Sequence, residues 1–152
     1  MSIIENISVV EDVTLVSLKD SPADIGLISS IFQMIADAGI DVDMISQTPH
    51  HSKMPDLSFT ISDDDFSKIL EIMAQLRQLN PDLKLTIQNG NCKISVFGEG
   101  MKGTPGVAVK VFNALNKANA DIIMITTSEV DISMLVSKHD LDAVLECLNE
   151  IQ

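Results

Sequence analysis

The chain has 152 residues, of which 45% are apolar and 21% charged, and its formal net charge is −12. This length can bury one or two small cores, and no apolar run approaches the ~20 residues that a membrane-spanning helix needs. The negative charge disfavours nucleic-acid binding, which draws on Lys and Arg facing phosphates, and the lack of Trp and Tyr removes the usual platforms for stacking bases.

The N-terminus and the cysteines indicate a cellular compartment. The segment MSIIENISVVED is acidic and lacks the basic and then apolar layout of a signal peptide. The two cysteines, Cys92 and Cys147, form no metal-ligand spacing. We therefore expect a cytoplasmic protein with free thiols.

The first half of the chain predicts elements in the order βαββαβ. The β-branched segment 13–18 predicts a strand that runs into a turn. Apolar residues at helical spacing predict a helix over 24–38, with Asp24 as its N-cap and Gly39 at its C-terminal stop. The patterns that follow predict strands at 42–47 and 57–62, a helix at 64–79 and a strand at 83–88.

The second half repeats this order but stops one strand short. Its predicted elements are a strand at 92–98, a helix at 105–118, strands at 122–127 and 131–136, and a helix at 140–151. The apolar residues of segment 3–10 predict a spare strand at the other end of the chain. Because an unpaired sheet edge over a core is unfavourable, we expect segment 3–10 to complete the second unit.

The two halves also match residue by residue. Segments 14–48 and 94–128 align at a constant spacing of 80, and after a loop five residues longer in the first copy the spacing becomes 75. The expected fold class is therefore α+β, with two ferredoxin-like βαββαβ units, the first inserted in the second. The expected domains are 11–90 and 3–10 plus 91–152.

Residues suited to catalysis or metal binding are sparse. No Ser or Cys lies in a nucleophile motif, and the adjacent His50 and His51 favour a solvated loop over a metal site. The glycine-rich segment 98–106 lacks the Gly-Lys-Ser/Thr end of a phosphate-binding loop. We expect no catalytic residue, metal or cofactor.

The turn between the first strand and the first helix of each copy is the best candidate for a binding site. These turns are 19–26 and 99–106. A helix N-terminus offers backbone N–H groups to a carboxylate, and glycine lets a ligand approach closely. Asp41 and Asp43, with Gln47, would take an ammonium group on the next strand. The pattern fits a free amino acid, and glycines that serve only the turn explain it equally well.

Three segments resemble the tandem ACT-domain regulatory region of aspartate kinases. They are IDVDMISQT (40–48), GEGMKGTPGVAVKVFNAL (98–115) and ITTSEVDISMLV (125–136). The resemblance covers nearly the whole chain and implies one ACT domain inserted in another, with feedback control of aspartate-family amino acid biosynthesis by lysine or threonine. It also implies a homodimer formed through ACT domains and a chain that is not an enzyme by itself. The alternatives are a regulatory fragment of an aspartate kinase, a separate subunit whose partner is an aspartate kinase catalytic subunit, and a free-standing ACT protein.

The resemblance implies two sets of effector-facing residues at an interface between ACT domains. The first-copy set is Asp20, Ile25, Gly26, Leu27, Val42, Asp43, Gln47 and Thr48. The second-copy set, which would face an effector or an interface, is Met101, Pro105, Gly106, Ile122, Ile123, Thr127, Ser128 and Glu129.

The two copies depart from the family pattern in different ways. The Pro-Gly pair of the family is intact at Pro105-Gly106 but is Ile25-Gly26 in the first copy, whereas Asp43 is matched by Ile123 in the second. If only one copy binds, we expect the first, with lysine slightly preferred over threonine. The alternative function is a purely structural ACT dimerisation module without a small-molecule ligand.

Overall fold

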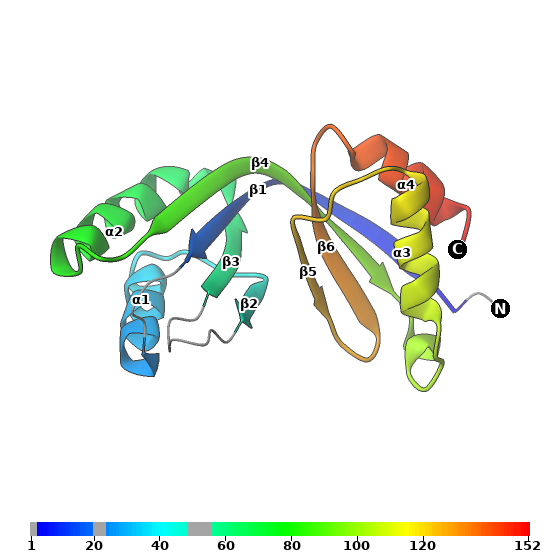
Figure 1. Cartoon of the computed structure of the whole chain (residues 1–152), viewed down its shortest axis with the longest axis horizontal. Coiled ribbons are helices and arrows are strands. Elements are labelled where there is room, and N and C mark those ends of the chain that lie inside the picture. The colour runs from blue at the N-terminus through cyan, green and yellow to red at the C-terminus, as the bar shows by residue number, and fades with distance from the viewer. Residues whose placement is uncertain (1–2, 20–23, 49–55) are drawn as a thin grey trace. The chain divides into compact units, whose positions relative to one another are not determined.

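The chain forms two compact units in the computed structural model, which describes residues 3–19, 24–48 and 56–152 (Figure 1). We call Asp12–Asn89 the inserted unit, and Met1–Glu11 together with Gly90–Gln152 the outer unit. Across these described ranges no helix has the length and apolar character needed to cross a membrane.

Helices and strands alternate in the predicted βαββαβ order. The first half contains β1 (Asn6–Leu18), α1 (Ile25–Asp37), β2 (Ile45–Thr48), β3 (Asp56–Ser62), the short 3-10 helix η1 (Asp63–Asp65), α2 (Phe66–Leu79) and β4 (Leu85–Phe97). The second half contains the 3-10 helix η2 (Glu99–Met101), α3 (Val107–Lys117), β5 (Met124–Thr127), β6 (Asp131–Ser137) and α4 (Leu141–Asn149). The predicted α+β fold class, with one unit inserted in the other, is confirmed.

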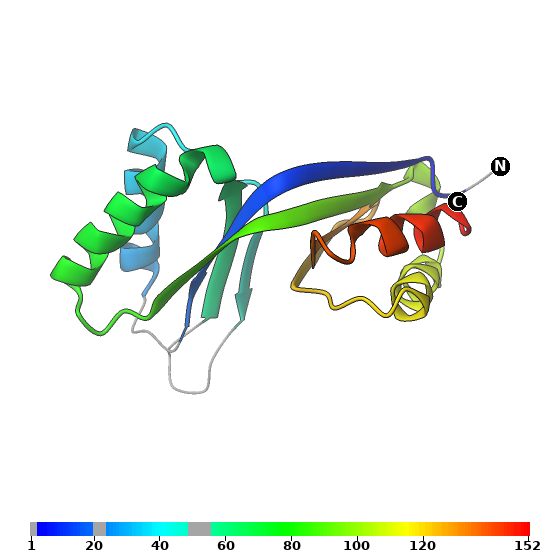
Figure 2. The same cartoon turned by 90° about the horizontal axis from the view of Figure 1, so that it is seen from above.

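Two long strands serve both units. The strand order is β2-β3-β1-β4-β6-β5, and both views show β1 and β4 lying side by side (Figures 1 and 2). The partner strand β3 pairs with Val13–Leu18 of β1, and β6 pairs with Asn91–Phe97 of β4. The N-terminal half of β1 therefore belongs to the outer unit, as strand counting predicted.

The expectation of separate strands on either side of each unit boundary is wrong. Segment 13–18 and most of segment 3–10 lie in one strand of 13 residues, and most of segments 83–88 and 92–98 lie in another of the same length. The polar residues that separate the two segments of each strand are of the kinds typical of turns. The two strands nevertheless continue through them because each remains beside the other.

Each unit has its own apolar core. In the inserted unit α1 and α2 cover the sheet, and the rings of Phe32 and Phe59 lie 5.3 Å apart. In the outer unit Ile4 is only 3% exposed and packs with residues of β4, β6, α3 and α4. Burying such a side chain stabilises a fold by roughly 1.5–3 kcal/mol, so the N-terminal segment is part of the outer core.

The register of the strands shows that the 80-residue spacing of the sequence alignment does not hold for the first strands of the two copies. Ser58 pairs with Ser17, whereas its equivalent Ser133 pairs with Ser95, and the hydroxyl groups lie 3.1 and 3.0 Å apart. The first strands are therefore 78 residues apart, not 80. The second copy has two additional residues between its first strand and first helix, within the turn 98–106.

Gly98 provides a test of how the N-terminal segment packs. A Cβ at Gly98 would lie 1.9 Å from the carbonyl oxygen of Ile3, and the Glu5 N–H donates to the Phe97 carbonyl at 2.8 Å. We expect Gly98→Ala to lower the free energy of unfolding by about 1–3 kcal/mol, because the backbone must shift. Urea denaturation measures this change.

Gly100→Ala is the matched control. A Cβ at Gly100 would meet nothing closer than 3.8 Å, which is ordinary contact with the Ile3 side chain. An equal loss of stability in both variants would show that Gly98 is not specifically required by the N-terminal segment.

Candidate functional site

The start of helix α1 in the inserted unit is capped by a carboxylate of the chain. Asp24 has an extended backbone, and its Oδ1 accepts a hydrogen bond of 2.8 Å from the Leu27 N–H. The prediction of Asp24 as N-cap is confirmed. A carboxylate at this position complements the positive end of the helix dipole, so a ligand carboxylate would compete with Asp24 for Leu27.

The other described members of the first-copy set lie mainly at the surface. Ile25 is 79% exposed, and Gly26 beside it is also exposed. Asp43 is exposed, and its N–H donates to the Thr60 carbonyl at 3.0 Å.

The remaining first-copy positions divide between the core and the sheet edge. Val42 and Leu27 pack partly against the core of the inserted unit. Gln47 and Thr48 are exposed on β2, which ends the strand order. Asp20 lies outside the described residues.

The start of helix α3 in the outer unit differs from that of α1. Its N-cap is Gly106, whose φ is +93°, and no side chain makes a capping hydrogen bond there. Glycine suits this left-handed conformation because it has no Cβ. Pro105 and Gly106 are exposed, so the backbone at this helix start is open to a ligand.

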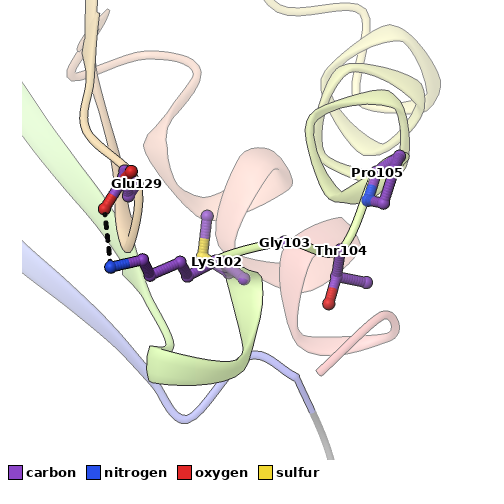
Figure 3. Close-up of a pocket in the computed structure, with 6 residues that line it drawn as sticks. Lys102, Gly103, Thr104, Pro105 and Glu129 are labelled. Atoms are coloured by element: carbon purple, nitrogen blue, oxygen red, sulfur yellow. Dashed lines mark ion pairs between the residues drawn. The ribbon is translucent and has the colours of Figure 1, made fainter.

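A pocket of about 350 Å³ lies beside this helix start. It is lined by Met101, Lys102, Gly103, Thr104, Pro105 and Glu129 (Figure 3). The turn that forms one wall is held firmly: Met101 is 8% exposed and packs in the outer core, and the Thr104 hydroxyl donates to the Gly100 carbonyl at 2.7 Å.

Opposite charges meet at the pocket. Lys102 Nζ lies 3.2 Å from Glu129 Oε2, and the two side chains are 68% and 73% exposed (Figure 3). Such exposed ion pairs contribute little to stability. Both groups are therefore available to bind a ligand that carries a carboxylate and an ammonium group.

The second-copy set is brought together only in part. Met101, Pro105 and Glu129 line the pocket, and the exposed Thr127 and Ser128 precede Glu129 at the end of β5. Ile122 instead packs against the outer core.

Ile123 contributes to the sheet through its backbone, because its N–H donates to the Leu135 carbonyl of β6 at 2.8 Å.

Sequence reasoning omitted Lys102, Gly103 and Thr104 from the second-copy set, although they lie within the candidate turn. The charge of Lys102 was the available signal, but its partner is distant in the sequence.

Metal and thiol chemistry contribute nothing further to this site. Among residues 3–19, 24–48 and 56–152 no three His, Cys, Asp or Glu side chains group closely enough to hold a metal ion, and His50 and His51 lie outside these ranges. Cys92 and Cys147 are free thiols, as expected.

Outside the candidate site, at the end of α3, a hydrogen bond to Glu150 raises the pKa of Lys117.

Comparison with known proteins gives the same architecture. Residues 15–80 and 94–152 each match the ACT domain. The ligand-free regulatory subunit of aspartate kinase from Thermus thermophilus is 27% identical, with a TM-score of 0.90 and 99% of both chains covered. A crystal structure of aspartokinase alpha and beta subunits gives 30% identity and a TM-score of 0.83, covering 97% of both chains.

The fold and the matches define a tandem ACT-domain regulatory protein. The aspartokinase of Corynebacterium glutamicum is 33% identical over 140 residues, which are 91% of this chain. The chain belongs to the family of ACT-domain regulatory regions of aspartate kinases, and the resemblance seen in the sequence is confirmed. The chain spans about a third of the length of the curated relatives that it matches, namely 32% and 36% of the first two.

The cap at α1 can be tested by substitution. We expect Asp24→Ala to lower the free energy of unfolding by about 0.5–2 kcal/mol, because the Leu27 N–H loses its acceptor. Asp24→Asn keeps a side-chain oxygen at the same position and should retain most of the stability. Urea denaturation followed by circular dichroism compares the three proteins, and equal stability of the Ala variant and the unsubstituted chain would contradict the capping role.

Proposed function

We propose that this chain controls an aspartate kinase by binding a free amino acid, lysine or threonine, as a feedback effector. The observation that carries the proposal is the pocket of the outer unit, where Lys102 and Glu129 place opposite charges beside an uncapped helix start. A free amino acid carries the complementary pair of charges. The volume of about 350 Å³ lies within the usual range for small-molecule sites.

In the outer unit each charge has a proposed role. Lys102, with the backbone N–H groups that begin α3, would bind the α-carboxylate of the effector, because helix starts and cations both favour anions. Glu129 would accept hydrogen bonds from the α-ammonium group. Its carboxylate supplies the amine acceptor that Ile123 does not provide at the position equivalent to Asp43.

In the inserted unit we propose that Asp43 is the ammonium acceptor, with Gln47 and Thr48 beside it on β2. Its exposure leaves room for a ligand. Because Asp24 already caps α1, the effector carboxylate would be bound by uncharged donors of the first-copy set, such as the Gln47 amide and the Thr48 hydroxyl. Asp43 suits the side-chain amine of lysine as well as an α-amine, and it is the reason that the sequence favoured the inserted unit if only one unit binds.

Regulation would follow from a difference in affinity. An effector shifts a conformational equilibrium only when it binds one arrangement better than the other, and a coupling of about 1–3 kcal/mol is typical. We propose that the effector contacts ACT domains of two chains in a cytoplasmic homodimer that also binds a catalytic subunit. The alpha and beta subunits of the similar aspartokinase support this assembly.

Titration with free amino acids tests the proposal directly. Calorimetry and thermal unfolding should show binding of lysine or threonine and a rise in the unfolding temperature, with methionine and the branched-chain amino acids as comparisons. At an effector concentration of 100 times Kd, binding stabilises the folded chain by about 2.7 kcal/mol. No heat and no thermal shift with any of these amino acids at millimolar concentration would refute a sensor function.

Charge-removing variants identify the unit that binds. Asp43→Asn should weaken binding roughly 10- to 100-fold if the inserted unit holds the ammonium group, and Glu129→Gln should do so if the outer unit does, since each removes a hydrogen bond to a charge. Glu71→Gln and Glu146→Gln change exposed carboxylates of the same units and serve as controls. Equal affinity in all four variants would assign binding to neither carboxylate.

The alternative function is a purely structural dimerisation module. The exposed apolar side chains of Val109 and Phe112 on α3, 59% and 46% exposed, favour it. Under this alternative the chain would self-associate in solution, and no free amino acid would alter its stability or its association.

A further inference from the structure

The hairpin that joins β5 to β6 carries Glu129 in a tight turn. The Ser128 N–H donates to the Asp131 carbonyl at 2.8 Å, in continuation of the pairing between the two strands. The turn between them therefore consists of two residues, Glu129 and Val130. The favoured two-residue hairpin turns need a positive φ, because their twist then matches that of the strands. Neither turn residue is among the described residues with a positive φ, so the turn alone does not fix Glu129.

The backbone of Gly98 joins this hairpin end to the other wall of the pocket. Its N–H donates to the Val130 carbonyl at 2.9 Å, and its carbonyl accepts from the Met101 N–H at 3.1 Å. The first bond holds the residue after Glu129, and the second closes the 3-10 turn that Lys102 follows. The distance of 3.2 Å between the two charged groups therefore depends on how the hairpin end is held beside β4 (Figure 3).

A carboxylate and two hydroxyl groups link the base of the hairpin to β4. The Ser133 hydroxyl donates to Asp131 Oδ2 at 2.6 Å and lies 3.0 Å from the Ser95 hydroxyl. Ser133 is opposite Ser95 in the sheet register and is only 4% exposed. Hydrogen bonds to a charged acceptor are stronger than those between neutral groups. This chain of side chains therefore ties the first residue of β6 to the neighbouring strand.

The inserted unit has the serine pair but a longer connection between the equivalent strands. The Ser17 and Ser58 hydroxyl groups lie 3.1 Å apart. Seven residues separate β2 from β3, whereas three separate β5 from β6. The inserted unit therefore offers a matched position at which loss of a serine hydroxyl should not affect the hairpin end of the outer unit.

We propose that Asp131, acting through Ser133, is a positioning residue for Glu129. The Asp131 carboxylate is held by Ser133, and the carbonyl of the same residue closes the turn. A hairpin end fixed in this way keeps Glu129 facing Lys102 and presents it to a ligand already ordered, which lowers the entropic cost of binding. Where it concerns a ligand, the proposal rests on the proposed function of the outer unit, whereas the placement of the hairpin end can be measured without a ligand.

Amide hydrogen exchange followed by NMR tests the positioning role. The N–H groups of Ser128 and Gly98 report on the hairpin end, and the Val144 N–H, which donates to the Asp140 carbonyl of the outer unit at 3.1 Å, reports on the unit as a whole. We expect Asp131→Ala to speed exchange at the two hairpin reporters roughly 10-fold, since it removes a hydrogen bond to a charge, with little change at Val144. Asp131→Asn keeps an acceptor oxygen and should restore slow exchange.

Ser133→Ala and Ser58→Ala form a matched pair, because each removes one hydroxyl from the serine pair of its unit. Only Ser133→Ala should speed exchange at the hairpin end. Equal effects of the two serine variants there would overturn the proposal. Unchanged exchange in Asp131→Ala, an equal acceleration at Val144, or equally fast exchange in Asp131→Asn would overturn it as well.

Titration with lysine and with threonine separates this proposal from the proposed function. If the outer unit binds the effector, Asp131→Ala should weaken binding roughly 10-fold, in the same direction as Glu129→Gln, and Asp131→Asn should largely retain it. If the unsubstituted chain binds neither amino acid, the proposed function fails, and exchange at the hairpin end still decides whether Asp131 positions Glu129. Full binding by Asp131→Ala, where Glu129→Gln has lost it, would overturn the positioning role.

Discussion

The sharing of β1 and β4 is the constraint on which the rest of the structure depends. Each unit obtains two of its four strands from halves of these two strands. The outer unit therefore joins the N-terminal segment to residues after 90, across the whole inserted unit, and Ile4 closes its core. Such pairing between distant segments costs loop-closure entropy before any contact is gained, so the inserted unit, whose contacts are closer in sequence, is the part better able to form first.

The helices and the duplicated order could be predicted because they depend on local periodicity. The helix predicted over 24–38 occurs at Ile25–Asp37, with its cap at Asp24. The continuity of the long strands could not be predicted, since the Glu11-Asp12 and Asn89-Gly90-Asn91 segments carry the polar residues and glycine typical of turns. Whether such a segment forms a turn or continues the strand is decided by the neighbouring strand, and here β1 and β4 are far apart in the sequence.

In the candidate site, too, features of a single segment could be predicted from the sequence, whereas contacts between distant segments could not. Pro105 and Glu129 belong to recognisable segments, but the ion pair of Lys102 with Glu129 joins a turn to the end of a hairpin. At α1 the sequence indicated an anion at the helix start, and the anion bound there is Asp24 itself. The same physical preference serves a cap and a ligand, so composition alone cannot distinguish them.

The two additional residues in the turn 98–106 have a structural consequence. In the outer unit they allow a 3-10 turn that buries Met101 and leaves Lys102 facing Glu129. This pocket is built from one turn and one hairpin end, and its charged groups remain mostly exposed. A ligand that touched only these groups would bind equally well in every arrangement of the molecule and would shift no equilibrium. Control by an effector at this pocket therefore requires that a second surface cover the ligand in one state and not in the other.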